Sequence, residues 1–415
     1  MNQPKARIAI IGGGPAGLAA ALAALGAGVQ VVVFERLPRV GTKLAATGGG
    51  RGNVAHVGDE QAFADAFGRR GRFAIPAWRA LGGADGLRRK LARLGVETVV
   101  DGEGRVYPAS MHAEDVRAAM EGAIRREGGE VQCAARVETL ERTPQGDWLV
   151  DGTRFVAVVL AAGGQSAPEL GSDGSGFALA RQLGHRVVAP VPGLAPLLLE
   201  EPWLSTHSGT SVDNARLRLR AGHRTVEVRG AVLATHFGLS GPAALAISGA
   251  VAREWTRTAG APDVRLELGL VPGPLDWEEL RRSHGAQSLR QLLAAWMPKK
   301  LAVGLLEHCG CPGDQPVARL DRAQRDRLER ALTAEPLHLR GIAPFAQSMV
   351  TCGGVDLKEV APDTLASRLV PALFLAGEVL DLDAPSGGWN LLWAFASGVL
   401  AGRSAAQAIG GGQTS

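Results

Sequence analysis

The chain has 415 residues, of which 46% are hydrophobic and 21% charged, a globular composition that excludes disordered, collagen-like and fibrous proteins. Its 45 basic and 41 acidic residues leave a net charge of +4, and no run of like charge indicates a nucleic-acid-binding surface. Four cysteines are too few and too unevenly spaced for a disulfide framework, so we expect a reduced, cytoplasmic protein.

A long apolar stretch at residues 8–34 resembles a signal peptide or a membrane span. Three glycines at 12–14 interrupt it, and its texture changes from β-branched residues at 8–11 to Ala and Leu at 18–25 and then to Val at 31–33. A membrane span needs ~20 residues of one helix, whereas this pattern is typical of a strand, a turn, a helix and a second strand. We therefore expect neither a membrane segment nor a cleaved signal.

The turn between the first strand and the helix has the spacing G-x-G-x-x-G, with Gly12, Gly14 and Gly17 as its glycines. Gly12 permits the tight turn, Gly14 lets a pyrophosphate approach the backbone, and Gly17 lets the helix pack close to the sheet. The helix N-terminus that follows favours phosphate. Glu35, at the end of the second strand, is expected to bind ribose hydroxyls and to disfavour the 2′-phosphate of NADP. The pattern predicts a dinucleotide site but does not distinguish FAD from NAD.

A second glycine-rich segment follows at 47–53, where three successive glycines precede Arg51 and Asn53. Such a loop exposes several backbone N–H groups, which form an anion-binding nest. Lys43, which lies just before the loop, and Arg51 add positive charge. We interpret the segment as a loop beside the pyrophosphate, and a flexible surface loop is the alternative.

The middle of the chain shows two different patterns of apolar residues. From about 187 to 272, apolar and charged residues alternate, for example at 217–220 and 264–268, which indicates half-buried antiparallel strands of a small β-barrel or sandwich. From 275 to about 342, apolar residues recur at helical spacing. Within that segment, Asp276 is expected to cap one helix and Pro298 to stop the next.

Four motifs carry a family resemblance: the triple-glycine loop, Thr235-His-Phe-Gly-Leu-Ser-Gly-Pro242, Ala376-Gly-Glu-Val-Leu-Asp381 and Gly387-Gly-Trp-Asn390. Through them the chain resembles a bacterial flavoprotein family that includes aminoacetone-oxidase-like proteins and a bile-acid dehydro-steroid reductase. Two positions depart from the family pattern, because Gly52 stands where the family has Cys and Trp389 stands where it has Tyr. Any thiol chemistry assigned to the first position is therefore lost in this chain.

The resemblance implies FAD as the cofactor and an α/β fold: a doubly wound FAD-binding Rossmann-like domain with an inserted small β-barrel and an inserted helical subdomain. We expect the first part of the FAD-binding domain at 1–186, the barrel at 187–273, the helical subdomain at 274–345 and the return segment of the FAD-binding domain at 346–410. In a doubly wound sheet the ligand lies at the carboxyl ends of the strands.

The resemblance also brings later segments to FAD. Glu378, which follows a strand expected at 372–376, corresponds to the residue that binds the ribityl chain. Val137, in a strand expected after Cys133, matches a position whose backbone contacts adenine. The end of the strand expected at 155–160 touches the cofactor in the family. With the residues named above, the expected cofactor-binding set includes Pro15, Ala16, Arg36, Gly49, Gly50, Ala162, Gly163, Gly164, Asp173, Gly377 and Gly388.

A helix expected to begin near Trp389 is the last predicted cofactor element. Its N-terminus would point at N1 and the C2 carbonyl of the flavin, where a helix terminus stabilises negative charge. Asn390 and Leu391 are the expected contacts, through backbone or side chain. An ordinary amphipathic helix has the same sequence signature, so that alternative stays open.

Several polar residues admit both a structural and a functional interpretation. Asp173 is either a helix cap or a cofactor contact. Asp381 and Asp383 are either solvated turn residues or part of the active-site lining. Cys352 is expected to be a buried, inert thiol.

Together with these patterns, the resemblance implies a flavin-dependent oxidoreductase that moves a hydride between FAD and an unidentified small molecule. NAD(P)H would visit only transiently, since no second G-x-G-x-x-G follows a later strand. The catalytic residues are not determined; His236 is a candidate acid or base, or else a histidine held by structural hydrogen bonds. Arg51 is a candidate for orienting an anionic substrate or the flavin. No metal is expected, because Cys309-Gly-Cys311 lacks a second Cys/His pair at zinc-site spacing.

Two other functions are alternatives to this one. A flavin monooxygenase would bring NAD(P)H-handling motifs, which the chain lacks. An FAD-containing protein that modifies or binds nucleic acid, such as tRNA, is the alternative from a different class, but there is no basic stripe or aromatic platform. We therefore expect a small-molecule substrate, with neither nucleic acid nor membrane as partner, and leave the oligomeric state and the direction of the reaction open.

Overall fold

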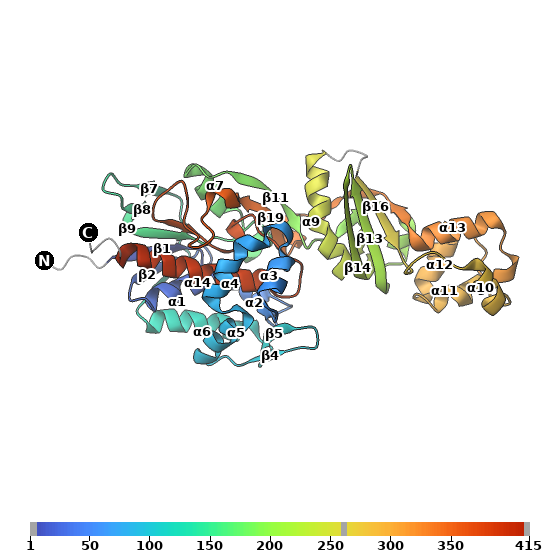
Figure 1. Ribbon diagram of the computed structural model, residues 1–415, viewed down its shortest axis with the longest axis horizontal. Coiled ribbons are helices and arrows are strands. Elements are labelled where there is room, and N and C mark those ends of the chain that lie inside the picture. The colour runs from blue at the N-terminus through green and yellow to red at the C-terminus, as the bar shows by residue number, and fades with distance from the viewer. Residues whose placement is uncertain (1–5, 259–263, 411–415) are drawn as a thin grey trace. The chain divides into compact units, whose positions relative to one another are not determined.

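The computed structural model describes residues 6–258 and 264–410. The chain divides into two compact units (Figure 1). The first comprises residues 1–190 and 350–415, and the second comprises residues 191–349. Each unit has its own hydrophobic core.

A parallel sheet forms the centre of the first unit. In the described part of this unit its five strands are β20 (Leu373–Leu375), β10 (Ala157–Leu160), β1 (Arg7–Ile11), β2 (Gln30–Phe34) and β6 (Glu130–Gln132), in that order. Every neighbouring pair is parallel. The strands are nearly continuous apolar runs because a parallel sheet is covered on both faces. The predicted doubly wound α/β domain is therefore present.

Helices α1 (Pro15–Leu25) and α14 (Trp389–Gly410) pack against each other with almost no space between their backbones (Figure 1). A Cβ atom on Gly398 would lie 2.2 Å from the carbonyl oxygen of Ala16, and one on Gly402 would lie 2.2 Å from that of Ala20. Within α1, a Cβ atom on Gly17 would lie 1.8 Å from the carbonyl oxygen of Gly12. The expectation that Gly17 permits close packing is confirmed.

The remaining elements of the first unit surround this sheet. The helices are α2 (Thr42–Ala46), α3 (Glu60–Ala66), α4 (Ile75–Leu81), α5 (Gly83–Arg93), α6 (Ala113–Arg126) and α7 (Ser175–Gln182), with 3-10 turns η1 (Gly68–Ala74), η2 (Pro168–Leu170), η5 (Leu357–Glu359) and η6 (Gly377–Val379). Small antiparallel sheets are formed by β3 (Ala55–His56), β5 (Arg105–Pro108) and β4 (Thr98–Val100), and by β7 (Leu140–Arg142), β8 (Trp148–Val150) and β9 (Thr153–Phe155). Strand β11 (Val187–Gly193) pairs with β19 (Val350–Val355).

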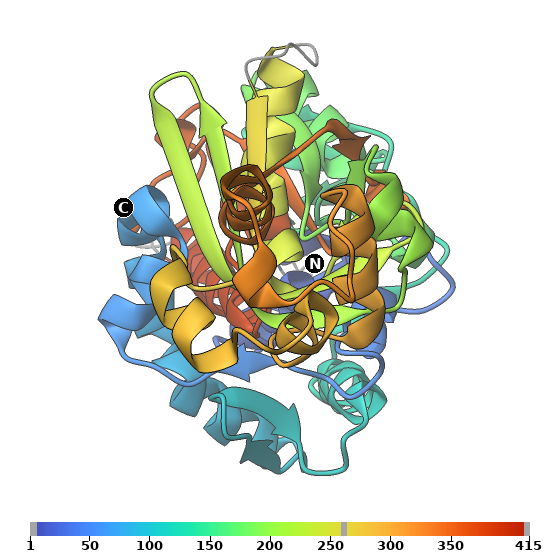
Figure 2. The same cartoon turned by 90° about the vertical axis from the view of Figure 1, so that its right-hand side faces the viewer.

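The second unit contains an antiparallel sheet. Its described strands run in the order β17 (Glu335–Leu337), β16 (Val264–Gly269), β13 (Ser211–Ala221), β14 (Arg224–Thr235), β15 (Gly238–Ser240), β12 (Leu197–Leu199) and β18 (Leu339–Ile342). Helix α9 (Pro242–Arg257) packs on the long hairpin of β13 and β14 (Figure 2), and α8 (Pro202–Thr206) precedes that hairpin in the chain. The alternating segments predicted as strands at 217–220 and 264–268 lie in β13 and β16, which confirms both.

The helical segment of the second unit consists of α10 (Trp277–His284), α11 (Leu289–Ala294), α12 (Lys299–His308) and α13 (Arg322–Thr333), with 3-10 turns η3 (Val317–Arg319) and η4 (Phe345–Gln347). Asp276 caps α10 by accepting the N–H of Glu279, and Pro298 lies between α11 and α12, as predicted. Sheet and helices share one core, which contains Leu268 and Leu305. The division of this unit into separate barrel and helical subdomains stays a prediction. Across the described ranges, no helix combines the length and the apolar character needed to cross a membrane.

We expect Gly398→Ala to lower the free energy of unfolding by roughly 1–3 kcal/mol, because the added Cβ atom overlaps the α1 backbone. The gain of about 1 kcal/mol in helix propensity offsets only part of this cost. The matched control is Gly102→Ala, whose Cβ atom would meet nothing within 4 Å. Urea denaturation followed by circular dichroism measures both variants, and equal midpoints would contradict the tight crossing.

Candidate functional site

The glycine-rich turn leads from β1 into α1 with the geometry of a phosphate site. Gly12 has a φ of 106° and donates its N–H to the carbonyl oxygen of Phe34 at 2.8 Å. Gly14 is the N-cap of α1 and gives the helix no side-chain cap, and Pro15 occupies the first turn. The first-turn N–H groups therefore lack intrahelical partners. A Cβ atom on Gly14 would meet nothing within 4 Å, so the space in front of these N–H groups is open and fits a pyrophosphate.

Glu35 directly follows strand β2, which ends at Phe34, and is buried with 9% of its surface exposed. Its Oε2 accepts the N–H of Gly13 at 3.0 Å, and its Oε1 accepts the N–H of Leu37 at 2.8 Å. Burial raises the pKa of this carboxyl, and the two backbone N–H groups only partly oppose the shift. Glu35 thus holds the glycine-rich turn in shape. Each carboxylate oxygen of Glu35 keeps a further lone pair that can accept a hydrogen bond. The expected contact with ribose hydroxyls is therefore compatible with this geometry and stays a prediction.

The triple-glycine loop is shaped by residues with left-handed backbone. Gly49 and Gly50 have φ values of 67° and 86°, and a Cβ atom on either would meet nothing within 4 Å. Arg51 turns back onto its own loop, where its Nε donates to the carbonyl oxygen of Gly48 at 3.2 Å. Gly52 has a φ of 81°, and its Cβ atom would lie 2.9 Å from the Cα atom of Ala113. The backbone itself therefore disfavours a cysteine at position 52.

Lys43, Glu378 and Thr351 converge from three distant segments of the chain. The Nζ of Lys43, on α2, lies 3.0 Å from the Oε2 of Glu378, on η6. The N–H of Thr351, on β19, donates to the Oε1 of Glu378 at 2.6 Å. About a quarter of each of the Lys43 and Glu378 side chains is exposed, so both can still meet a ligand. Lys43 and Glu378 were both expected to bind the cofactor, and here they form an ion pair with each other. The sequence around either residue does not indicate this pairing.

Thr351 is a site residue that the sequence did not reveal. Its Oγ1 accepts the N–H of Gln165 at 2.7 Å and that of Ser166 at 3.1 Å. A Cβ atom on Gly164 would lie 2.3 Å from the same oxygen. Thr351 thus fixes the loop after β10, which carries Ala162, Gly163 and Gly164. The available signal is a threonine two positions before a pair of glycines in the returning strand, and it does not specify a partner.

The first turn of α14 is tied to the triple-glycine segment. The Asn53 side chain donates to the carbonyl oxygen of Ala55 at 2.9 Å and accepts the N–H of Gly388 at 3.3 Å. The ring of His56 stacks on Trp389 with their centroids 4.2 Å apart. These contacts place Asn53 and Gly388 together, although neither was predicted to contact the other.

The predicted helix does begin at Trp389. The side chain of Asn390 accepts the N–H of Ala384 at 2.9 Å and donates to the carbonyl oxygen of Ala384 at 2.8 Å. It is therefore committed to the preceding loop. Only the backbone N–H groups of Asn390 and Leu391 are left to face a ligand, since the first N–H groups of a helix have no intrahelical acceptor.

Asp173 and Arg36 organise the loop that leads into α7. Asp173 accepts the N–H of Ser175, the first residue of α7, at 3.0 Å, but the N-cap of α7 is Gly174 and no side chain caps the helix. The expected N-cap role of Asp173 is therefore not borne out, and its contact with the cofactor stays a prediction. Although burial raises its pKa, the hydrogen bonds from Ser175 and the charges of Arg36 and Arg136 hold the pKa below its usual value. The guanidinium of Arg36 donates to two carbonyl oxygens of this loop. One belongs to Pro168, the first residue of η2, at 2.6 Å, and the other to Gly171, which directly follows η2, at 3.2 Å.

Two expectations need correction. Val137 was expected in a strand but lies in the loop between β6 and β7, where it is buried. The interpretation of Asp381 as a solvated turn residue is wrong, because only 3% of it is exposed and it pairs with Arg70. The nitrogen Nη1 of Arg70 also donates to the Asp381 carbonyl oxygen at 2.8 Å. Asp383 accepts a hydrogen bond from the Sγ of Cys352 at 3.2 Å, and Cys352 is buried as expected.

His236 belongs to the second unit, whereas the predicted cofactor-binding residues belong to the first. It is exposed and lies in the turn between β14 and β15. Its ring meets the ring of Phe237 edge-on, with the two ring centroids 4.9 Å apart. Among the described residues, none is hydrogen-bonded to its ring, so the structural hydrogen-bond alternative has no support.

Cys309 and Cys311 are buried, and burial raises the pKa of Cys309 to about 12. Within the described ranges no cluster of three metal-ligating side chains occurs.

A family model described as the HI0933-like protein Rossmann domain matches residues 6–404. The chain belongs to the HI0933-like Rossmann family. It is 34% identical over 414 residues to the 3-dehydro-bile acid delta(4,6)-reductase of Clostridium scindens, an alignment that covers 97% of this chain and 99% of that protein. The family and the fitting phosphate site make this HI0933-like protein an FAD-dependent oxidoreductase, as the sequence predicted.

Other relatives of this HI0933-like protein carry a different name. It is 27% identical over 400 residues to the ribosomal RNA dihydrouridine synthase of Haemophilus influenzae, covering 94% of this chain and 95% of that one. It is 35% identical over 244 residues to the Escherichia coli protein of that name, covering 58% of each chain. A solved structure of 3-ketosteroid delta1-dehydrogenase from Sterolibacterium denitrificans shares the fold with a TM-score of 0.50 at 12% identity, covering 96% of this chain and 99% of that chain.

Two glycine variants separate cofactor binding from folding. We expect Gly14→Ala to cost the cofactor-free protein no more than about 1 kcal/mol, the usual effect at an N-cap, but to raise the Kd for FAD about tenfold or more, because the methyl group enters the open space. Gly17→Ala should instead destabilise the fold, since its Cβ atom overlaps the Gly12 carbonyl. FAD titration and thermal unfolding measure the two effects. Unchanged FAD affinity in Gly14→Ala would show that phosphate does not bind at this turn.

Proposed function

We propose that this protein reduces a carbon–carbon double bond conjugated to a carbonyl group in a small, largely apolar molecule, with NAD(P)H as a transient source of electrons. The observation that carries the proposal is the end-to-end similarity to a reductase whose name specifies a 3-oxo steroid with delta-4 and delta-6 double bonds. A bound FAD supplies the hydride chemistry.

The residues of the first unit support this assignment by what they offer to FAD. The first-turn N–H groups of α1 and the open space at Gly14 suit the pyrophosphate. Glu378, held by Lys43 and by the N–H of Thr351, offers carboxylate oxygens to the hydroxylated chain of the cofactor. The backbone N–H groups at the start of α14 favour negative charge, by ~0.3–1 kcal/mol when exposed and up to ~2 kcal/mol when partly buried. In this way the protein adjusts the electron affinity of the cofactor.

A reductase of this kind also needs a group that delivers a proton to the substrate. We propose His236 for this role, because its imidazole ring is exposed and its ring nitrogens can donate and accept a proton. Arg51 is less suited to bind a substrate anion than the sequence suggested, because it donates back to Gly48 and lies over the ring of Tyr107. The proposal therefore assigns Arg51 to holding the triple-glycine loop.

The relatives named ribosomal RNA dihydrouridine synthases indicate a second candidate function. Their name specifies reduction of a uracil ring, whose reactive double bond is also conjugated to a carbonyl group. The two candidate functions thus share their chemistry and differ in the size and charge of the substrate. The small net charge of +4 supports the small molecule.

An anaerobic experiment separates the two candidates. We expect NADH or NADPH to bleach the yellow holoprotein, and a 3-oxo-delta-4 steroid to restore the colour with formation of the saturated ketone. The matched control is the 3-oxo steroid that lacks the double bond, which should restore nothing. Recovery with an unmodified ribosomal RNA transcript, but not with the enone, would favour the second candidate. Recovery with neither substrate would overturn the proposal.

We expect His236→Ala to slow recovery by the enone by about 10²-fold or more, the usual contribution of a general acid, while reduction by NAD(P)H and FAD content stay unchanged. The control is His223→Ala, because His223 is also exposed and lies in the turn between β13 and β14 of the same unit. Stopped-flow absorbance at several pH values measures the rates. An unaltered rate and pH profile in His236→Ala would remove this residue from the mechanism.

A further inference from the structure

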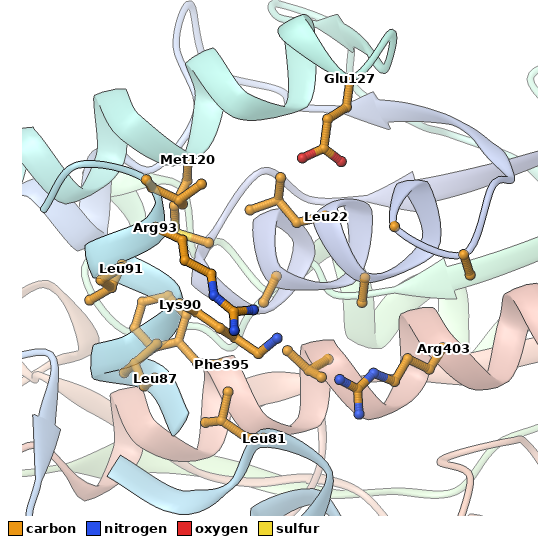
Figure 3. A pocket seen from close by; sticks show the side chains of 16 residues that line it. Leu22, Leu81, Leu87, Lys90, Leu91, Arg93, Met120, Glu127, Phe395 and Arg403 are labelled. Atoms are coloured by element: carbon orange, nitrogen blue, oxygen red, sulfur yellow. The ribbon is translucent and has the colours of Figure 1, made fainter. Parts of the chain in front are cut away.

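A cavity of about 480 Å³ opens between helices α1, α5, α6 and α14 of the first unit (Figure 3). It has the size of a site for one small organic molecule. Apolar side chains from all four helices line it, among them Leu22, Leu87, Met120 and Phe395. The hollow opens to solvent, and Arg93 and Arg403 of its lining are exposed.

The cavity is separate from the dinucleotide site. It is lined by the C-terminal half of α1, Leu22 and Ala23, and by Gly26 and Ala27 just beyond it. The phosphate-binding turn lies at the other end of the same helix, at Gly14. The 11 residues of α1 span roughly 16 Å at 1.5 Å per residue, so a molecule at one end does not occupy the other.

Three cationic side chains enter this apolar space. Lys90 and Arg93 come from α5 and Arg403 comes from α14, and Figure 3 shows their charged ends directed into the same region. Arg403 donates to the carbonyl oxygen of Ala80 at 2.8 Å, which fixes its position. In the described part of the chain, no carboxylate forms an ion pair with any of the three, and Glu127 on the α6 side is the acidic residue of the lining.

The clustering has an electrostatic cost. Burial lowers the pKa of Lys90, and the charges of Arg403 and Arg93 lower it further. A half-buried ammonium among apolar side chains and two guanidinium groups is stabilised by an anion that binds beside it. An anionic head group would meet that need, and an apolar body would fill the remaining volume.

We propose that this cavity binds a small amphipathic anion. Its carboxylate or phosphate head would bind Lys90 and Arg403, and its apolar body would lie among Leu22, Met120 and Phe395. This site is independent of the proposed function, because it shares no residue with the dinucleotide site.

Calorimetric titration of the FAD-loaded protein tests the proposal, with dodecanoate and dodecyl phosphate as probes below their micelle concentrations. We expect one molecule of probe to bind per chain, and the tighter of the two identifies the head group. Dodecyltrimethylammonium, which has the same chain and the opposite charge, and acetate, which lacks the chain, should not bind.

Two variants locate the bound probe. Lys90→Met replaces a half-buried cation with an apolar side chain of similar length, and should raise the Kd about tenfold or more. Ala23→Phe should fill the cavity and abolish binding. The matched control is Arg89→Met, which removes a cation from the neighbouring position of α5 outside the lining and should leave the Kd unchanged. Flavin absorbance should be the same in all four proteins.

Three results would overturn the proposal. The first is no binding of either anionic probe. The second is equal binding of dodecyltrimethylammonium, which would show simple detergent partition. The third is a wild-type Kd in both Lys90→Met and Ala23→Phe, which would place the probe elsewhere on the protein.

Discussion

The close crossing of α1 and α14 is the contact on which the first unit depends. Gly398 and Gly402 let the two helix backbones approach to a distance that any side chain would prevent. Because α1 begins at the glycine-rich turn after β1 and α14 begins at the loop beside Asn53, the crossing brings an early and a late segment of the described chain together. The C-terminal half of α1 and the middle of α14 also both contribute residues to the lining of the cationic cavity.

Partly buried carboxylates hold the site around this crossing. Glu35 accepts two backbone N–H groups, Glu378 accepts one from Thr351 and pairs with Lys43, and Asp381 pairs with Arg70. A carboxylate removed from water is tolerated only when such partners are present. The same partners give each loop a fixed position, so the protein itself shapes the cofactor site.

The family and the fold specify flavin chemistry, but they do not specify the substrate. The relative at 34% identity is named a 3-dehydro-bile acid delta(4,6)-reductase, and the one at 27% identity is named a ribosomal RNA dihydrouridine synthase. In such a fold the cofactor supplies the reaction, and the parts of the chain around it select the molecule that reacts.

The sequence by itself determined the features that depend on neighbouring residues. The turn at Gly12, the parallel strands, the strands β13 and β16 and the start of α14 at Trp389 follow from periodicity, apolar runs and glycine spacing. Only the tertiary structure decided which distant groups meet: Lys43 and Glu378 are 335 positions apart, and Arg70 and Asp381 are 311 apart. It also showed that Asn390 is committed to its own loop. The reason is physical, because backbone preference acts over a few residues, whereas the partner of a buried charge is fixed by how whole elements pack.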